Sequence, residues 1–329
     1  MARRVTMADI AATVGTSTTA VSLVLTGRGR GRVGAELAEK IRRAAAHLGY
    51  RPDPALRALL AHRESKRSKH AYRKVGLVIT APTEEDWRKS PYHQGVFAGF
   101  TERAAELGFG VARAIFGRPD PAVIRRLRAR GVDGLLLAQP AGLTDSLEAD
   151  WQGFALVGIG SAMARSPFTI VGPHHQWNMQ MLAEQLFQAG HRRIAYLPQR
   201  LMDEGVKRSW MNWADGAARE DSRWLGAIRN IETLSPLLAW CQQNRPDAIL
   251  TADPWARIVP AHVRPPCAGY SLGLESRSEG AGGIFQRPKE IGRAALELLD
   301  LNLRNNILGT QPHAPRLLVP GEWIPPGNG

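Results

Sequence analysis

Gly15 separates two short segments that each carry the apolar spacing of an amphipathic helix. Glycine readily adopts the left-handed conformation that ends a helix, so the first helix should stop at Gly15. The second should begin at Ser17 or Thr18, because either hydroxyl can cap it. Thr6, followed three residues later by Asp9, resembles a capping box at the start of the first helix. Two short helices joined by a tight glycine turn form a helix-turn-helix, so we expect this motif at the amino terminus.

The positive charge of the chain is concentrated in the same region. The 329 residues carry a net charge of +13, and residues 1–74 hold 16 of the 43 Lys and Arg but only 5 of the 30 Asp and Glu. A solvated basic tail would explain the charge alone, whereas a phosphate-binding head explains both the charge and the helical pattern. We expect a third helix over about 34–48, a short helix over about 54–63 that orders on DNA, and a basic linker over 64–74.

The second helix of a helix-turn-helix enters the major groove, where its first polar side chains reach base edges. Ser, Thr, Thr and Ser occupy those positions here, although the two threonines could instead serve only as helix caps. The arginines of the Gly-Arg run at 27–32 suit phosphates, which position a protein without specifying sequence; the alternative is a solvated loop. The predicted DNA-binding residues are Thr6, Ser17, Thr18, Thr19, Ser22, Arg28, Arg32, Tyr50 and Leu59.

From Val75 onward, apolar runs of strand length alternate with amphipathic segments of helix length. Such alternation is typical of parallel sheets covered by helices on both faces. The expected strands are 75–80, 109–115, 133–138, 155–159, 168–171, 193–197, 247–251 and 267–271. The expected helices lie near 92–107, 120–130, 176–189, 208–219, 235–244 and 288–304. We therefore predict an α/β core over 75–329 with two doubly wound parallel-sheet subdomains, about 75–170 and about 171–300, and a C-terminal segment that returns.

The sequence disfavours several other classes of protein. No apolar run approaches the roughly 20 residues of a membrane helix. Cys241 and Cys267 lack metal-ligand spacing and suit a reducing cytoplasm, where we expect the protein to reside. No cofactor or metal is expected, and the pair at 174–175 has no third ligand at metal spacing. Residues 269–273 match the Gly-x-Ser-x-Gly nucleophile elbow, but no helical pattern follows Ser271, so we do not expect an enzyme.

Ordered segments along the whole chain form a specific set. They are residues 5–11, 14–17, 20–22, 24–25 and 48–53 in the head, and residues 189–195, 286–292 and 317–323 beyond it. In this combination the chain resembles the lactose-repressor (LacI/GalR) family of bacterial transcription regulators. The resemblance implies a periplasmic-binding-protein-like core, a homodimer or a pair of dimers, and hinge helices that order in the minor groove. In the family a hinge leucine wedges between central base pairs, and Leu59 matches it here, where it could also pack against the partner's hinge helix.

The chain departs from the family at recognition positions. The family's usual Thr and Arg in the recognition helix are Ala20 and Leu23, which removes one bidentate guanine reader. A sugar-clamping Arg of the family is Trp213 here, and the segment 217–233 looks short for the helix and strand normally found there. The family's Asn-Asp pair becomes Ala-Asp at 252–253. The predicted effector-binding residues are Trp87, Tyr92, His175, Arg208, Trp213, Asp253 and Gln286, and for each aromatic residue core or surface packing is the alternative.

These patterns predict a sequence-specific DNA-binding transcription regulator, a repressor, that binds a palindromic double-stranded operator as a homodimer. A small-molecule effector, such as a sugar or a derivative, would modulate it. The alternative is a sugar-binding or sugar-modifying protein with an accessory basic head. Deletion of residues 1–63 distinguishes the two, because a regulator should lose specific DNA binding and keep a folded, dimeric core.

Overall fold

A computed structural model describes most of the chain. The described residues are 5–25, 33–48, 50, 73–80, 90–116, 121–138, 151–160, 166–198, 204–251, 255–263, 266–274, 282–311 and 313–327. The predictions for Arg28, Arg32, Leu59, Trp87 and Asp253, and for the hinge helix over about 54–63, lie outside this part of the chain.

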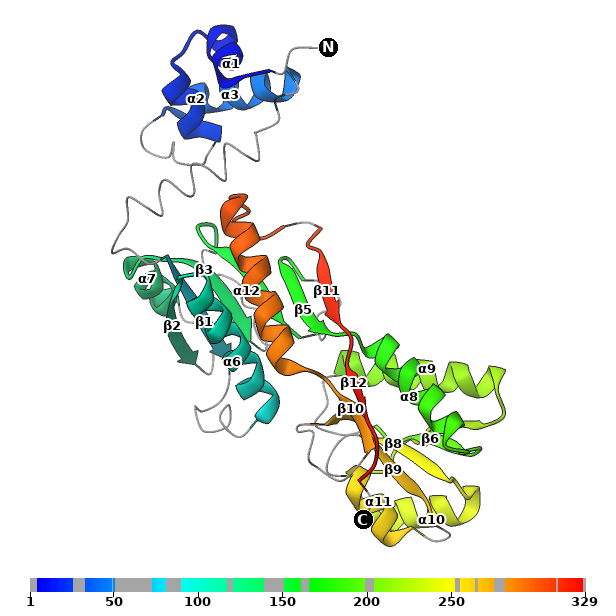
Figure 1. Cartoon of the computed structure of the whole chain (residues 1–329). Helices are drawn as coiled ribbons and strands as arrows, with labels where there is room; N and C mark the ends of the chain where they lie inside the picture. Colours follow the sequence, from blue (N-terminus) through cyan, green and yellow to red (C-terminus); the bar gives the residue numbers. More distant parts are fainter. Residues whose placement is uncertain are drawn as a thin grey trace. The chain divides into compact units, whose positions relative to one another are not determined.

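The amino-terminal head contains three helices, α1 (Met7–Val14), α2 (Thr18–Leu25) and α3 (Ala35–His47) (Figure 1). One side chain of each helix, Ile10, Val21 and Ile41, is fully buried in a shared core. Helices this short are marginal alone, so the common core is what stabilises them. Among the described residues no single helix is long and apolar enough to cross a membrane, and α1 and α2 satisfy that criterion only as a pair bent by 110°.

The first sheet, called sheet A, has six parallel strands in the order β11-β5-β4-β3-β1-β2 within the described residues. Its strands are β1 (Lys74–Thr80), β2 (Gly110–Phe116), β3 (Val132–Ala138), β4 (Ala155–Ile159), β5 (Thr169–Pro173) and β11 (Arg316–Val319). Helices α6 (Pro91–Glu106) and α7 (Pro121–Ala129) follow β1 and β2. Ile124 and Leu127 of α7 pack on buried leucines of β3, which is the helix-on-sheet burial that the alternating sequence pattern predicts.

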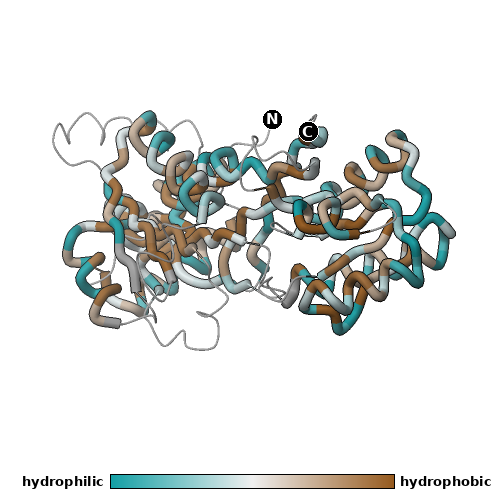
Figure 2. The backbone as a smooth tube through the Cα atoms, turned by 90° about the horizontal axis from the view of Figure 1, so that it is seen from below, coloured by the Kyte–Doolittle hydropathy of each residue, from teal (hydrophilic) through white to brown (hydrophobic). Residues whose placement is uncertain are grey.

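The second sheet, called sheet B, has the order β12-β10-β9-β8-β6-β7, and within it only β12 runs antiparallel to its neighbour. Its strands are β6 (Ile194–Tyr196), β7 (Trp224–Ala227), β8 (Ala248–Thr251), β9 (Ala268–Leu274), β10 (Gly282–Phe285) and β12 (Glu322–Ile324). Helices α8 (His175–Gln188) and α9 (Glu204–Glu220) share one apolar cluster with the sheet, and α10 (Leu234–Asn244) and α11 (Trp255–His262) share another. Apolar stretches in Figure 2 accordingly follow the strands, with polar stretches on outer helices and turns.

The chain passes between the two sheets more than once. After β5 in sheet A it enters α8, and after β10 in sheet B it enters α12 (Pro288–Arg304). Helix α12 lies against α6 at backbone distance: a Cβ at Gly99 would lie 1.9 Å from the carbonyl oxygen of Lys289, and a Cβ at Gly292 would lie 1.9 Å from that of Val96. Glycine at both positions is therefore required by the close approach of the two helices.

The fold class is that of the sequence prediction: a helix-turn-helix head followed by two parallel-sheet α/β domains. Each predicted strand and helix of the core has an observed counterpart within a few residues. The segment 217–233, which looks short for the helix and strand normally found there, holds the end of α9 at Glu220 and the four-residue strand β7 from Trp224. Helix α11 and strands β7, β10, β11 and β12 were not predicted.

Candidate functional site

The first turn of α2 presents an exposed row of hydroxyl side chains. Ser17, Thr18 and Thr19 are exposed, whereas Ser22, one turn later, is half-buried. The Ser17 hydroxyl accepts a hydrogen bond from the backbone N–H of Ala20 at 3.1 Å, so Ser17 caps α2. Val21, in the same helix, is fully buried in the core of the head and fixes the orientation of the helix. The hydroxyls of Thr18 and Thr19 are therefore held outward at the positive end of the helix dipole.

Helix α1 and the turn after it hold α2 in place. The Thr6 hydroxyl accepts from the backbone N–H of Asp9 at 3.3 Å, and the Asp9 carboxylate accepts from the backbone N–H of Thr6 at 2.7 Å. This is the capping box that the sequence predicts. Gly15 ends α1 with φ 71° and ψ 39°, a left-handed conformation that turns the chain toward Ser17. Thr6 itself is exposed, and its contact with DNA stays a prediction.

Tyr50 and Ala20 pack against the apolar core of the head. Tyr50 is half-buried against the head's apolar cluster, and its backbone N–H donates to the carbonyl oxygen of Ala45 at 2.9 Å. Ala20 also packs against that cluster, so its small side chain contributes to the core of the head. The DNA-contacting role of Tyr50 stays a prediction.

In the core, His175 at the start of α8 lies in an aromatic cluster. Its ring centroid is 5.0 Å from that of Trp210 on α9, and Trp210 lies 6.0 Å from Tyr196 at the end of β6, both in edge-on arrangements. Burial, together with the smaller effect of the neighbouring His174, lowers the pKa of His175 to about 4. At neutral pH the His175 ring is therefore uncharged, with one nitrogen that donates and one that accepts a hydrogen bond.

The other predicted effector residues are distributed around this cluster. Trp213 packs edge-on against Trp224, the first residue of β7, with ring centroids 5.0 Å apart. Trp213 and Trp210 thus point to opposite ends of sheet B. Arg208 is exposed on α9. Gln286 is half-buried after β10, and its side-chain amide donates to the carbonyl oxygen of Leu272 at 3.2 Å.

Tyr92 belongs to the other sheet. It lies in the first turn of α6, on sheet A, with its ring 5.4 Å from that of His93. Burial raises the pKa of Tyr92, so its hydroxyl stays protonated. The structure therefore brings His175 next to Trp210, a residue that the sequence analysis missed, and does not bring the whole predicted set into mutual contact. The effector role of each of these residues stays a prediction.

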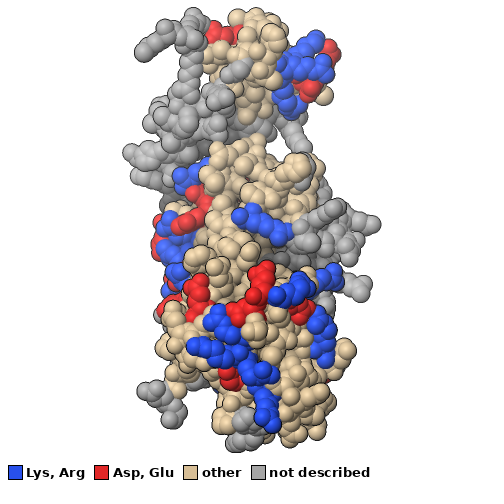
Figure 3. Space-filling model, turned by 90° about the vertical axis from the view of Figure 1, so that its right-hand side faces the viewer, with Lys and Arg blue, Asp and Glu red and all other residues tan. Residues whose placement is uncertain are grey.

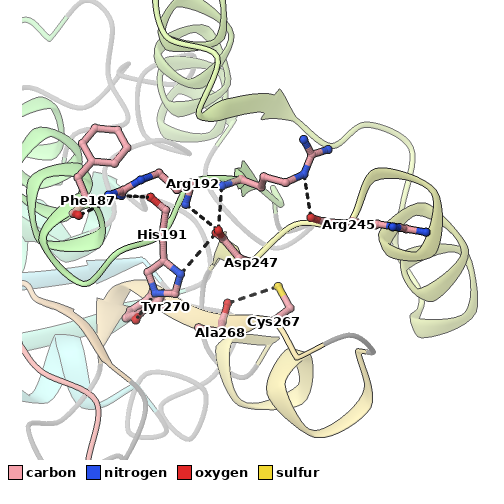
Figure 4. A network of polar contacts seen from close by, with 9 residues as sticks. Phe187, His191, Arg192, Arg245, Asp247, Cys267, Ala268 and Tyr270 are labelled. Carbon is pink, nitrogen blue, oxygen red and sulfur yellow. Dashed lines mark hydrogen bonds and ion pairs between the residues drawn. The ribbon is translucent and has the colours of Figure 1, made fainter.

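A polar network lies at the opposite, amino-terminal edge of sheet B (Figure 4). His191 places one ring nitrogen 2.9 Å from the Tyr270 hydroxyl and the other 3.4 Å from the Asp247 carboxylate. Asp247 also accepts from the backbone N–H groups of Arg192 at 2.6 Å and Arg193 at 3.1 Å. These bonds fix the turn from α8 into β6 to the start of β8 and β9. The sequence signal that marks this network is the His-Arg-Arg run at 191–193, which its bonds identify as a structural anchor.

The apparent nucleophile elbow is a strand. Ser271 lies within β9, is fully buried, and accepts a hydrogen bond from the backbone N–H of Gly273 at 3.2 Å. A nucleophile elbow needs its serine exposed on a sharp strand-to-helix turn. The geometry around Ser271 therefore offers no nucleophile. Cys241 and Cys267 are likewise buried as free thiols, and burial raises their pKa values to about 11 and about 12.

Comparison with known proteins identifies the head. Residues 6–53, which include the capped α1, the glycine turn and the exposed start of α2, match the family described as "Bacterial regulatory proteins, lacI family". The head is therefore similar to the domain that this family model describes. The chain is also 27% identical over 201 residues to the maltose regulon regulatory protein MalI of Escherichia coli (strain K12), an alignment that covers 60% of this chain and 54% of MalI. The match thus spans about half the length of that curated relative.

Several solved structures are similar in fold to this chain. A lac repressor dimer bound to operator and the anti-inducer ONPF has a TM-score of 0.52 at 19% identity, with 98% of each chain covered. A complex of the regulator CelR with cellobiose has a TM-score of 0.54 at 20% identity and the same coverage. A LacI-type regulator of Bacillus cereus subsp. cytotoxis NVH 391-98 has a TM-score of 0.58 at 17% identity, with 79% of this chain and 99% of the other covered. At these identities the likeness establishes the architecture.

Proposed function

We propose that this chain is a sequence-specific DNA-binding transcription regulator, a repressor, that acts on a palindromic double-stranded operator as a homodimer. The observation that carries the proposal is the lacI-family head, in which a buried core holds the hydroxyls of Thr18 and Thr19 outward at the start of α2. In a helix-turn-helix this turn meets the base edges in the major groove. The concentration of positive charge in residues 1–74 supplies the phosphate contacts that such a head needs.

We further propose that the core binds a small-molecule effector, a sugar or a derivative. The relatives support this class: the CelR structure contains cellobiose, and MalI is named for the maltose regulon. His175, kept neutral by burial and placed against Trp210, offers a donor, an acceptor and an aromatic surface, which suits a polyhydroxylated ligand. We infer no catalytic step, because Ser271 lies buried in a strand. The reducing cytoplasm remains our proposed location.

Random-site selection on the full-length chain tests the regulator proposal. We expect enrichment of a palindrome, whose two half-sites follow from a symmetric dimer. Thr18→Ala with Thr19→Ala should relax the selected sequence at one or two positions of each half-site. A matched control is Thr13→Ala, since Thr13 is also exposed on the head but its hydroxyl donates back to the carbonyl oxygen of Asp9 at 2.8 Å.

The outcomes separate the candidates. Loss of specific binding on deletion of residues 1–63, with a dimeric core in sedimentation, supports the regulator. Absence of any enriched sequence at physiological salt would refute it. Calorimetry with a panel of mono- and disaccharides, on the wild type and on His175→Gln, tests the effector proposal; heat that is identical for both forms would remove His175 from the site.

A further inference from the structure

One edge of sheet A carries an excess of positive charge that folding does not explain. Parallel strands begin at the same edge, and Lys74, the first residue of β1, pairs with Val132, the first residue of β3. Helix α7 leads into β3 through Arg130 and Gly131, so the last turn of α7 lies at this same edge. The Lys74 ammonium group confirms the contact, because it donates to the carbonyl oxygen of Arg130 at 3.1 Å. Figure 1 shows α7 beside these strands.

Six basic side chains, here called the basic edge, gather at this place. They are Arg73, Lys74, Arg125, Arg126, Arg128 and Arg130, all exposed. Over residues 73–74 and 121–133 the only acid is Asp133. Burial raises the pKa of its carboxyl group, and the positive charge of Arg73 offsets part of that rise. Glu106, at the end of α6, accepts hydrogen bonds from Arg103 and Arg293. Its negative charge is therefore neutralised by those two arginines and not by the basic edge.

Local structure accounts for part of the basic edge. Lys74 complements the carboxyl end of α7, and the Arg128 guanidinium stacks over Phe154 at 5.0 Å. Arg125, Arg126 and Arg130 have no acidic partner among the described residues. Arg126 and Arg130 are one helical turn apart, so their charges repel and destabilise the isolated fold. On the face of the core that Figure 3 shows, by contrast, basic and acidic side chains lie interspersed. Unpaired arginines on one edge indicate an anionic partner.

We propose that the basic edge contacts the phosphates of double-stranded DNA that flanks the operator. The connection of the chain favours DNA over other polyanions. Arg73 is joined to the end of the head at Tyr50 by 22 residues (51–72), which can span at most about 75 Å. DNA held by the head is therefore within reach of the basic edge, at a high effective concentration. Arginine side chains pair with phosphates bidentately, so even a few such contacts add affinity without adding sequence specificity.

The inference rests on the proposed regulator function, and the experiment separates the two. Full-length protein is titrated, over a series of salt concentrations, against two duplexes that carry the selected operator. The short duplex ends at the operator, and the long one extends it by about 20 base pairs on each side. We expect the wild type to bind the long duplex several-fold more tightly at low salt. Arg126→Gln with Arg130→Gln should bring the ratio of the two affinities to about one and leave binding to the short duplex unchanged.

The salt dependence gives an independent readout. Each lost phosphate contact should make the slope of log K against log salt less negative by about 0.9, so the double variant should differ from the wild type by about 1.8 per protomer on the long duplex. The matched control is Arg219→Gln with Arg245→Gln, two exposed arginines of the sheet B half that change the net charge equally. Thermal unfolding verifies that both variants stay folded.

Each outcome decides one of the two claims. A wild-type affinity ratio of one, an unchanged ratio in the Arg126/Arg130 variant, or equal effects of both double variants would overturn the basic edge as a DNA-binding surface. Loss of retention on a poly-glutamate resin with no change on DNA would instead assign the surface to an acidic protein, and would also overturn it. If the wild type recognises neither duplex specifically, the regulator function itself fails.

Discussion

Acidification should destabilise the core through His175. Burial against Trp210 lowers the pKa of this imidazole to about 4, whereas it is 6.5 in an unfolded chain. Between these two values the unfolded chain binds a proton that the folded chain does not bind. Stability contributed by His175 is therefore complete above pH 6.5 and is lost progressively as the pH falls toward 4.

The magnitude follows from the two pKa values. Each pH unit over which only the unfolded state is protonated lowers the free energy of unfolding by about 1.36 kcal/mol. From pH 7 to pH 5 the free energy of unfolding therefore falls by about 2 kcal/mol. For a core of this size that loss lowers the Tm by about 4 to 8 °C. His93, whose pKa burial also lowers, acts in the same direction, so the total change in the wild type should exceed the share of His175.

The assay is thermal unfolding of the wild type and of His175→Gln between pH 7.5 and pH 4.5. The variant should show a shallower fall in Tm with falling pH, and the difference between the two profiles isolates His175 from the carboxylates that titrate in the same range. His313→Gln, at an exposed position, is the matched control and should keep the wild-type profile. Parallel profiles for the wild type and His175→Gln would refute the reasoning that the ring is buried in its neutral form.

The remaining predictions concern the head and the packing of the core. Ser17→Ala removes the cap of α2 and should cost the head about 1 kcal/mol, measured by the unfolding of residues 1–50 followed by near-ultraviolet or nuclear magnetic resonance signals; an unchanged head would contradict the cap. Ile10→Ala opens a cavity in the small head core and should cost about 2 to 5 kcal/mol, so specific DNA binding should disappear while the core keeps its own unfolding transition. Gly99→Ala places a methyl group 1.9 Å from the Lys289 carbonyl oxygen and should destabilise the core by about 3 kcal/mol or more. Gly108→Ala, in open space but at φ 74°, should cost only the backbone strain of about 1 to 2 kcal/mol, so equal losses would contradict the close approach of α6 and α12. Asp247→Asn should weaken the anchor at the start of β8, because the two backbone N–H groups of Arg192 and Arg193 lose a charged acceptor, and hydrogen exchange at those amides should rise.

The elements that the sequence predicts are those with strong local signals. Helix α1 has a capping box, a periodic apolar face and a glycine stop, and all three appear in the structure. The interior strands β1, β3 and β4 are continuous apolar runs, because parallel strands are buried on both faces. Local chemistry alone was sufficient in these cases.

The helix and strands that the sequence does not predict depend on contacts between residues far apart in the sequence. Strands β7, β11 and β12 have only three or four residues each, and β11 is mostly exposed, so their few apolar residues are too short a run to predict a strand. Helix α11 contains Pro260, which argues against a helix on local grounds, yet Ala256 approaches Gly269 of β9 closely. A pairing partner or a close packing neighbour specifies such elements, and neither is visible along one chain.

The same division applies to the site. The exposed hydroxyls at the start of α2 were predictable because they sit one turn after a glycine stop. Trp210 was not, because its contact with His175 joins the start of α8 to α9 across 35 residues of sequence. A tryptophan three residues before Trp213 is a signal that could have been used, since both occupy one side of the same helix.

Under the proposed function, the composition of α2 determines where affinity for DNA must come from. Thr18 and Thr19 present single hydroxyls, and the positions at which the family usually has Thr and Arg are Ala20 and Leu23. A good bidentate pair discriminates a base by about 1 to 3 kcal/mol, and this chain lacks the arginine that would supply one from α2. Phosphate contacts must then provide a larger share of the free energy of binding.

This requirement agrees with the charge of the chain, which is +11 over residues 1–74 and +2 over the rest. A regulator that relies on phosphate contacts loses affinity for DNA steeply as the salt concentration rises. The ratio of its affinity for specific DNA to its affinity for nonspecific DNA is also smaller. Additional contacts outside the operator, such as those of the basic edge, increase affinity without any change in α2. The ratio of specific to nonspecific affinity, measured at physiological salt for the wild type and for Leu23→Arg, tests this argument: the substitution should raise the ratio, and a ratio that stays constant would show that position 23 does not face the bases.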